Sequence, residues 1–406
     1  MKKDVLYKII EKYGVVVYGA GRIGQNVYSM LKDWGCSPLM AWDKNAQNIR
    51  DSIEIEEISE PIVDYKNKQI PIIVCINAKV VYDSVLKELT DQGFVNVYWI
   101  REIEQNQLCG HSKTFFLQKC NKCGVNRGGC RAYINHLMSN RKNILPINEI
   151  TIIPTYTCSL ACKYCSEKVY EMKKNKIVVN GNEEVLENAI HNMVEAIGWL
   201  RQVNIFGGEI FLYKKWPQIV RSCLSNSNIG IVHILTNGVC NIDESDLSLL
   251  KHEKIVIEMD DYGEKISETK QQLFKNTQCL FDNNGINYAV VNNKIGTWYD
   301  FGSFHKRGSS IEELETRYAN CPGTGCMILD PNGCFTICGR QSFAESLGEE
   351  INIKGKESIK VLNYTVEELR LALEELLSKK YLEMCDYCDG AKRIVPAGEQ
   401  VDCTGY

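Results

Sequence analysis

Three cysteines with short spacing carry the clearest chemical signal in this chain. They are Cys158, Cys162 and Cys165, separated by three and then two residues. Thiolates at that spacing can converge on a single metal centre, because a tight loop brings the three sulfurs to one point. No fourth cysteine follows until Cys223. Three protein ligands leave one metal position open, which a reactive centre needs and a purely structural site avoids.

A second motif, Gly207-Gly208-Glu209, stands further along the chain. Two glycines let the backbone approach a ligand closely, and the carboxylate beside them can bind the ammonium group of an amino acid. Each motif follows a run of apolar and β-branched residues, 149–157 and 203–206, which predicts a buried strand. We therefore expect both motifs at the carboxyl ends of strands, where α/β barrels place functional loops.

Together, the two motifs resemble those of the radical S-adenosylmethionine (SAM) enzymes. In that family, three cysteines hold a 4Fe-4S cluster whose fourth iron is bound by the amino and carboxylate groups of SAM. The resemblance implies that Cys158, Cys162 and Cys165 are cluster ligands and that Glu209 binds the SAM amino acid. It also implies that Tyr164 lies against the adenine. A structural zinc knuckle is the alternative, but it uses four ligands and leaves the Gly-Gly-Glu motif unexplained.

Two further pairs of residues match SAM-binding positions of the family. Thr236 and Asn237 follow a predicted strand, and Glu258 and Asp260 end the next one. The resemblance implies that these polar groups contact the ribose and the amino acid of SAM. Glu258 departs from the family pattern, which has a serine two residues before the aspartate.

Strand and helix patterns alternate from residue 149 onward, which is typical of a parallel sheet in an α/β protein. Strands are predicted near 149–157, 202–206, 230–235, 254–259 and 286–291, and helices near 184–200, 216–226, 243–252 and 265–283. The resemblance to radical SAM enzymes implies an open, partial (β/α)6 barrel. Beyond the last strand, Trp298–Asp300 and His305–Arg307 could contact substrate or form a loop surface.

A glycine-rich turn between a strand and a helix marks the amino-terminal part of the chain. Val15–Tyr18 predicts a short buried strand; Gly19, Gly21 and Gly24 open the helix after it; and Asp43 ends the next predicted strand. This pattern is typical of a dinucleotide fingerprint, in which glycines form the turn, the helix start binds phosphate and the carboxylate binds ribose.

The amino-terminal unit stops near residue 105, short of a two-lobed Rossmann domain, after further predicted strands at 72–76 and 95–100. It resembles the small Rossmann-like modules at the front of sugar-modifying and surface-polysaccharide proteins. Three roles stay open for it. They are binding of a nucleotide or nucleotide-sugar, binding of NAD(P), and a structural or docking role in which the glycines serve packing.

A cysteine-rich connector follows, with candidate ligands Cys109, Cys120, Cys123, Cys130 and His136. Two cysteines separated by two residues form a good chelating pair, and the later cysteine and histidine could complete a tetrahedral zinc site. The same residues could instead contribute ligands to an iron–sulfur cluster, or bind no metal.

The carboxyl-terminal part of the chain holds a second strong cysteine pattern: Cys321, Cys338, Cys385 and Cys388. The stretch 328–338 predicts a β-hairpin that returns its last cysteine beside the first of the four. A predicted helix near 365–380 precedes the final pair. Four thiolates from separate segments can ligate one cluster completely.

This arrangement resembles the auxiliary-cluster extension called SPASM and its shortened form, Twitch. It implies a small α+β domain that holds one auxiliary 4Fe-4S cluster, with zinc as an alternative occupant. Three cysteines, Cys326, Cys334 and Cys403, are left over and could help to build a second auxiliary cluster. The sequence thus predicts four segments, at 1–107, 108–147, 148–310 and 311–406.

The composition excludes several classes of protein. The net charge is −4 with both signs interspersed, which indicates no nucleic-acid surface. No apolar run reaches the length of a membrane span, and the amino terminus has helical spacing rather than the pattern of a signal peptide. Nineteen cysteines without an export signal favour metal–sulfur centres over disulfides, so we expect a cytoplasmic protein.

The resemblance implies an oxidoreductase-like enzyme that cleaves SAM to a 5′-deoxyadenosyl radical and removes a hydrogen atom from its substrate. It also implies a flavodoxin- or ferredoxin-type electron donor. An auxiliary cluster that accepts an electron favours net oxidation. The glycine-rich front module favours a small-molecule substrate, sugar-like or nucleotide-sugar-like. A peptide substrate is the alternative, and an iron–sulfur electron carrier or sensor is a remote one.

Overall fold

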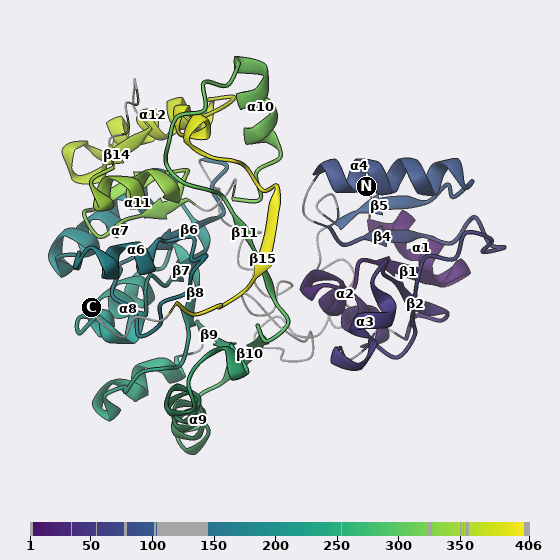
Figure 1. Cartoon of the computed structure of the whole chain (residues 1–406), viewed down its shortest axis with the longest axis horizontal. Helices are drawn as coiled ribbons and strands as arrows, with labels where there is room; N and C mark the ends of the chain where they lie inside the picture. Colours follow the sequence, from purple (N-terminus) through teal and green to yellow (C-terminus); the bar gives the residue numbers. More distant parts are fainter. Residues whose placement is uncertain are drawn as a thin grey trace. The chain divides into compact units, whose positions relative to one another are not determined.

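The computed structural model describes residues 3–33, 35–53, 55–76, 79–100, 103, 145–252, 254–323, 327–349, 351, 353 and 357–401. The chain divides into two compact units, Met1–Ser139 and Asn140–Tyr406 (Figure 1). The segments predicted at 148–310 and 311–406 both fall within the second unit. Among the described residues, no helix is both long enough and apolar enough to span a membrane.

The first unit is built on a five-stranded sheet in the order β3-β2-β1-β4-β5, and every neighbouring pair of strands is parallel. Its strands are β1 (Val15–Tyr18), β2 (Leu39–Trp42), β3 (Ile58–Ser59), β4 (Ile72–Val74) and β5 (Val97–Trp99). Its helices are α1 (Lys3–Tyr13), α2 (Arg22–Asp33), α3 (Ala46–Ile49) and α4 (Lys79–Asp91). All four residues of β1 are buried, as expected for a parallel strand covered on both faces. The predicted strands at 15–18 and 39–42 are confirmed.

The second unit contains an eight-stranded sheet in the order β10-β9-β8-β7-β6-β12-β13-β14. The pairings from β10 to β12 are parallel, and the last two are antiparallel. The strands are β6 (Glu149–Ile152), β7 (Leu200–Ile205), β8 (Ile229–Thr236), β9 (Ile255–Asp261), β10 (Tyr288–Asn292), β12 (Ile328–Leu329), β13 (Cys334–Thr336) and β14 (Ser358–Lys360). The predicted hairpin is therefore β12–β13, and it continues the sheet that begins with β10.

The helices of the second unit follow the predicted alternation. They are α6 (Val169–Lys174), α7 (Glu183–Ile197), α8 (Trp216–Ser225), α9 (Glu268–Asn283), α10 (Ile311–Ala319), α11 (Gly339–Leu347) and α12 (Val366–Leu377). Helix α7 begins where the side chain of Asn182 accepts a hydrogen bond from Val185 N–H, and it buries an apolar stripe that includes Leu186, Ile190 and Met193.

Two predicted elements differ from the structure. The strand predicted over 149–157 ends at Ile152, shortly before Pro154, which has no N–H to donate to a neighbouring strand. The helix predicted over 243–252 is a 3₁₀ helix, η5 (Glu244–Lys251), which begins where Asp243 accepts a hydrogen bond from Ser245 N–H.

A two-stranded antiparallel ribbon joins distant parts of the second unit. Strand β11 (Thr297–Asp300) pairs with β15 (Arg393–Pro396), and the two strands lie side by side in Figure 1. In this pairing, Trp298 lies opposite Val395. Trp298 also packs edge-on against Tyr262, with ring centroids 6.1 Å apart. The ribbon leads the carboxyl-terminal residues back to the loop that carries the first three cysteines.

Candidate functional site

The loop that carries Cys158, Cys162 and Cys165 follows β6 and packs against the Gly-Gly-Glu motif after β7. The backbone N–H of Glu209 donates to the carbonyl of Thr157 at 2.7 Å. A Cβ atom at Gly208 would lie 2.1 Å from that same carbonyl oxygen. Gly207 has φ +123, and a Cβ there would lie 2.5 Å from the oxygen of Thr155. The two glycines are therefore required for the close approach of two loops.

The three thiols share one buried environment. Burial raises the pKa of Cys158 to about 12, and the neighbouring charges of Glu209 and Cys162 add to the effect. Burial also raises the pKa of Cys162 to about 11. It holds the pKa of Cys165 well above its usual value, and the charges of Cys162 and Cys158 contribute to this rise. The charges of Cys162 and Cys158 thus act on other thiols of the same loop. Binding of a metal by these thiols therefore has to displace their protons.

Amide groups point at two of the three sulfurs. Asn237 Nδ2 and the backbone N–H of Leu160 each donate to Cys158 Sγ at 3.4 Å. Gln400 Nε2 donates to Cys162 Sγ at 3.0 Å. Donors of this kind stabilise negative charge on a thiolate ligand, as they do in iron–sulfur proteins.

Glu209 connects the loops that follow β7 and β8. Its carboxylate is 1% exposed and accepts hydrogen bonds from Thr236 Oγ1 (2.7 Å), Asn237 N–H (2.8 Å) and Phe211 N–H (3.1 Å). A carboxylate has about four acceptor positions, so capacity for one further donor remains. Burial raises the pKa of Glu209 to about 7 although the three donors act in the opposite direction. An ammonium group at this carboxylate would favour its charged form.

Further acidic groups lie close to the cysteine loop. Burial raises the pKa of Glu167 to about 8, and Asp260 adds to that rise. The negative charge of Asp260 also contributes to the raised pKa of Glu209. One oxygen of Asp260 accepts a hydrogen bond from Asn293 Nδ2 at 2.6 Å. The structure thus brings Asp260 into the same environment as Glu209.

Glu258 has a different neighbour. It is 2% exposed, and its carboxylate lies 3.6 Å from Nε2 of His233, which is equally buried. The other ring nitrogen of His233 hydrogen-bonds Asn204 Oδ1 at 3.0 Å. Because Glu258 and Asp260 are two residues apart on β9, they share one face of the sheet. Glu258 lies two residues further than Asp260 from the carboxyl end of β9, next to His233.

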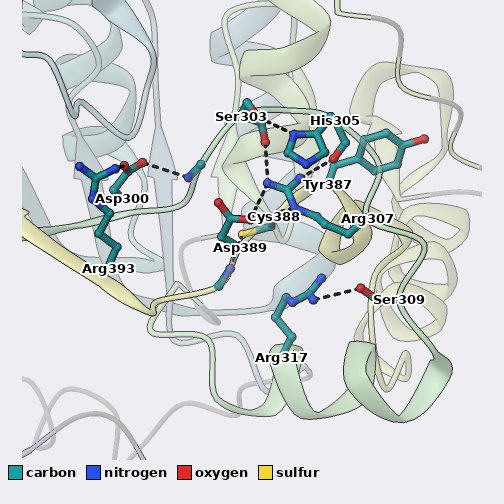
Figure 2. A network of polar contacts seen from close by, with 12 residues as sticks. Asp300, Ser303, His305, Arg307, Ser309, Arg317, Tyr387, Cys388, Asp389 and Arg393 are labelled. Carbon is teal, nitrogen blue, oxygen red and sulfur yellow. Dashed lines mark hydrogen bonds and ion pairs between the residues drawn. The ribbon is translucent and has the colours of Figure 1, made fainter.

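Tyr164 contacts cations from two segments. The Lys163 ammonium lies 5.0 Å from the centre of its ring, and the Arg393 guanidinium lies 5.4 Å from it. Arg393 also donates to the Tyr164 hydroxyl at 3.4 Å. The same guanidinium donates to Asp300 at 3.0 Å, and Figure 2 shows these two side chains beside one another. The aromatic residue that precedes the third cysteine is therefore held from the β11–β15 ribbon.

The four carboxyl-terminal cysteines lie on or just after three segments: α10, β13 and the 3₁₀ helix η8 (Glu383–Tyr387). Burial raises the pKa of Cys338 above its usual range, and the charges of Cys321, Cys385 and Cys388 add to the rise. Burial raises the pKa of Cys385 to about 12, again with Cys321 and Cys388 contributing. That these four cysteines share one centre stays a prediction, which the influence of Cys321, Cys385 and Cys388 on the pKa of Cys338 supports.

Arg340 is a buried cation beside these cysteines that the sequence pattern did not reveal. Its guanidinium donates to the carbonyls of Tyr387 (2.9 Å) and Ser303 (3.0 Å) and lies 4.4 Å from the ring centre of Phe304. Burial lowers the pKa of Arg340, while the thiolates of Cys388 and Cys338 would raise it. A fixed positive charge here favours the thiolate forms that a metal centre requires.

A polar network holds the loop 302–309 against the final cysteine pair (Figure 2). Arg307 Nε donates to Asp389 at 2.9 Å, and its NH2 group donates to the carbonyl of Ser303 at 3.0 Å. Arg317 bonds both Ser309 Oγ, at 3.0 Å, and the carbonyl of Cys385. Arg307, a candidate for substrate contact on sequence grounds, is therefore engaged in supporting the cysteine segment.

The leftover cysteines are placed only in part. Cys334 lies on β13, and the groups that shift its pKa include no other cysteine. Cys326 and Cys403 lie outside the described residues, as do all the connector candidates: Cys109, Cys120, Cys123, Cys130 and His136.

Within the part of the chain that the structure describes, no three His, Cys, Asp or Glu side chains are arranged as a ligand set for one metal ion. A 4Fe-4S cluster takes cysteine thiolates as its ligands. The three cysteines of the loop after β6 and, separately, the four carboxyl-terminal cysteines have the soft thiolates that such a cluster takes.

In the first unit, the carboxylate predicted to bind ribose is hydrogen-bonded to the glycine turn itself. Asp43 Oδ2 accepts a hydrogen bond from Ala20 N–H at 2.7 Å. Gly19 has φ +94, and a Cβ at Gly24 would lie 1.8 Å from the oxygen of Gly19. By contrast, a Cβ at Gly21 would meet no atom within 4 Å. Backbone conformation therefore accounts for Gly19 and close packing for Gly24, while Gly21 borders open space.

Gly24→Ala is expected to lower the free energy of unfolding of the chain by about 2 kcal/mol or more, because the added methyl group has to displace the backbone turn. Gly21→Ala is the matched control and should change it by less than about 0.5 kcal/mol. Urea denaturation followed by circular dichroism measures both. Equal effects of the two substitutions would contradict a packing role specific to Gly24.

Comparison with known proteins identifies one segment of the chain. Residues 152–264 match the model of the radical SAM superfamily, and no curated protein matches the chain. Similar solved structures include native anSMEcpe with bound AdoMet (21% identity over 35% of this chain and 43% of that one, TM-score 0.28). A second is Streptococcus suis SuiB, with 18% identity over 36% of this chain and 32% of that one and a TM-score of 0.27. A third is BtrN in complex with AdoMet and 2-DOIA, with 14% identity over 64% of this chain and 98% of that one and a TM-score of 0.38.

The match to the first two of these structures thus spans less than half of their length. The family model covers both the loop with Cys158, Cys162 and Cys165 and the motif that ends in Glu209. Between residues 152 and 264, the chain contains a radical SAM domain.

Proposed function

We propose that the chain is a radical SAM enzyme that binds a 4Fe-4S cluster through Cys158, Cys162 and Cys165. One observation carries the proposal. The loop with the three cysteines packs directly on the motif that ends in Glu209, at the carboxyl ends of neighbouring parallel strands. When bound, the cluster with SAM supplies the reductive cleavage of SAM and the radical that abstracts a hydrogen atom.

The residues of the chain bind and orient SAM in this proposal. Glu209 receives the ammonium group, since its buried carboxylate keeps capacity for one more donor. Thr236 and Asn237 hold Glu209 in place by donating to its two oxygens. Tyr164 offers its ring to the adenine, and Asp260 offers a second carboxylate at the same edge of the sheet. Burial of the loop limits access of water to the reacting groups.

An auxiliary 4Fe-4S cluster at Cys321, Cys338, Cys385 and Cys388 extends the proposal. Beyond the effect of burial, the charges of Cys321 and Cys388 raise the pKa of both Cys338 and Cys385, and Arg340 adds a fixed positive charge beside them. Four thiolates complete the ligation of one cluster, so this centre is suited to electron transfer rather than to SAM binding. A single Twitch-like cluster is favoured over two auxiliary centres because residues 389–402, which follow the final cysteine pair, contain no further cysteine.

For the substrate we propose a sugar-like or nucleotide-sugar-like small molecule, oxidised or rearranged by hydrogen abstraction. The support is the first unit, whose strand order β3-β2-β1-β4-β5 corresponds to the doubly wound nucleotide-binding class. Gly21 leaves space beside the start of α2, where a phosphate group could approach. In this proposal the electron donor is a flavodoxin or ferredoxin, and the enzyme works in the cytoplasm. The four segments predicted from the sequence are its domains and connector.

The proposal predicts that the protein consumes SAM. After anaerobic reconstitution with iron and sulfide and reduction with dithionite, the chain should convert SAM to 5′-deoxyadenosine and methionine, measured by liquid chromatography. Unreduced protein is the control and should form neither. A reduced protein that carries clusters and leaves SAM intact would contradict the enzyme and favour an electron carrier.

A further inference from the structure

The carboxyl-terminal residues of the second unit pair with the loop that holds the first three cysteines. Cys162 and Gln400 form an isolated antiparallel bridge. The two segments exchange two backbone hydrogen bonds, from Lys163 to Glu399 at 2.8 Å and from Val401 to Ala161 at 2.9 Å. The cysteine loop is thus held from a segment at the far end of the sequence, although neither segment belongs to a regular strand.

The side chain of Gln400 uses both ends of its amide in this contact. Its Nε2 donates to Cys162 Sγ at 3.0 Å and to the carbonyl of Gly398 at 2.8 Å. Its Oε1 accepts from Ala161 N–H at 3.0 Å. The two N–H groups of a primary amide are therefore both engaged, and the oxygen fixes the orientation of the group. Rotation of the amide would place its oxygen against sulfur and break all three bonds.

The turn before Gln400 is itself anchored. Gly398 has φ +69, and a Cβ there would lie 2.1 Å from the ring of Tyr262. Lys265 Nζ donates to the carbonyl of Ala397 at 2.8 Å and to that of Asn293 at 2.9 Å. The turn that carries Gln400 is consequently anchored by Tyr262 and Lys265, which follow β9, in addition to its own bonds to the cysteine loop.

We propose that Gln400 is a positioning residue that sets the reduction potential of the cluster bound at Cys158, Cys162 and Cys165. The inference rests on the proposed function, since it requires a cluster at these cysteines. A hydrogen bond to a thiolate ligand stabilises negative charge, and the reduced cluster carries more negative charge than the oxidised one. The bond from Gln400 to Cys162 therefore raises the reduction potential and makes the cluster easier to reduce.

Two substitutions separate the parts of this contact. Gln400→Leu removes the bond to sulfur without adding charge. Gln400→Glu keeps an oxygen for Ala161 N–H but loses the donor to Cys162 Sγ. Gln272→Leu is the control for replacing a glutamine by leucine, because Gln272 is exposed on α9. Glu399→Gln is the control for the neighbouring residue, because it breaks only the exposed ion pair with Lys163.

The measurement is a redox titration of the anaerobically reconstituted full chain, followed by electron paramagnetic resonance. The signal to follow is the one that disappears in the Cys158/Cys162/Cys165→Ala variant. We expect its potential to become more negative in Gln400→Leu and in Gln400→Glu, and to stay at the wild-type value in Gln272→Leu and Glu399→Gln. The signal of the auxiliary cluster serves as the internal reference and should not move.

The remaining outcomes of this titration also test the role of Gln400. Wild-type potentials in both Gln400 variants, with the iron content retained, would overturn the inference. Loss of iron from this cluster alone would also overturn it, because Gln400 would then serve to retain the cluster rather than to set its potential. Equal loss from both clusters would overturn it, since the effect would then be general unfolding. If the wild type shows no signal that depends on Cys158, Cys162 and Cys165, the proposed function fails and this inference fails with it.

Discussion

Replacement of Cys158, Cys162 and Cys165 by Ala is expected to lower the iron content of the reconstituted chain from about eight to about four atoms. SAM cleavage should disappear in the same variant. The physical reason is that these thiols share one buried loop, while the four carboxyl-terminal cysteines group separately. The remaining iron should therefore stay at the auxiliary centre. Iron and acid-labile sulfide are counted on both proteins after anaerobic reconstitution.

A matched triple variant controls for the loss of thiols as such. Cys36, Cys223 and Cys279 lie on or beside helices of the two units, so their replacement by Ala should leave the iron content unchanged. A fall from about twelve to about eight atoms in the first variant would instead mean a second auxiliary cluster. A fall from about four to none would remove the auxiliary centre, and with it the argument for an oxidative reaction.

The sequence predicted the local parts of the site, because each motif directly follows a strand that its own residues specify. The strand β7 ends at Ile205, just before the glycines, and β8 ends at Thr236. Parallel strands bring their carboxyl ends to one edge, so Glu209 and Asn237 meet there without any further information. What the motif could not show is that Glu209 accepts three hydrogen bonds from neighbouring groups of the protein itself.

Long-range contacts were not predictable from local patterns. Gln400 reaches Cys162 only because β15 pairs with β11 and returns the chain to the cysteine loop. Such pairing joins short strands far apart in the sequence, and neither has a pattern that specifies its partner. Arg340 is similar, since its place beside the cysteines depends on three backbone carbonyls from two separate segments, at residues 302–303 and at Tyr387. The glycine turn of the first unit is ambiguous for another reason. The same glycine pattern fits a phosphate-binding turn and a turn that only needs close packing, so the sequence does not distinguish the two roles.

Glu209→Gln is expected to weaken the binding of SAM to the cluster-loaded protein by about 10- to 100-fold. A hydrogen bond to a charged group contributes about 1.5–3 kcal/mol, and every 1.4 kcal/mol is about a factor of ten in affinity. The amide keeps the size of the carboxylate but carries no charge to attract an ammonium group. It also presents an N–H group where Asn237 N–H donates in the wild type. Anaerobic equilibrium dialysis with labelled SAM measures the affinity.

The pH dependence of binding provides a second, independent sign of the same interaction. Burial raises the pKa of Glu209 to about 7, so the carboxyl is protonated below that pH and then cannot pair with the ammonium of SAM. Wild-type affinity should therefore fall as the pH is lowered through about 7, and this dependence should be lost in Glu209→Gln. Glu357→Gln is the matched control, because Glu357 is also a buried carboxylate that accepts backbone N–H groups. If Glu209→Gln binds SAM as the wild type does, with the same slope in pH, Glu209 does not receive the ammonium group.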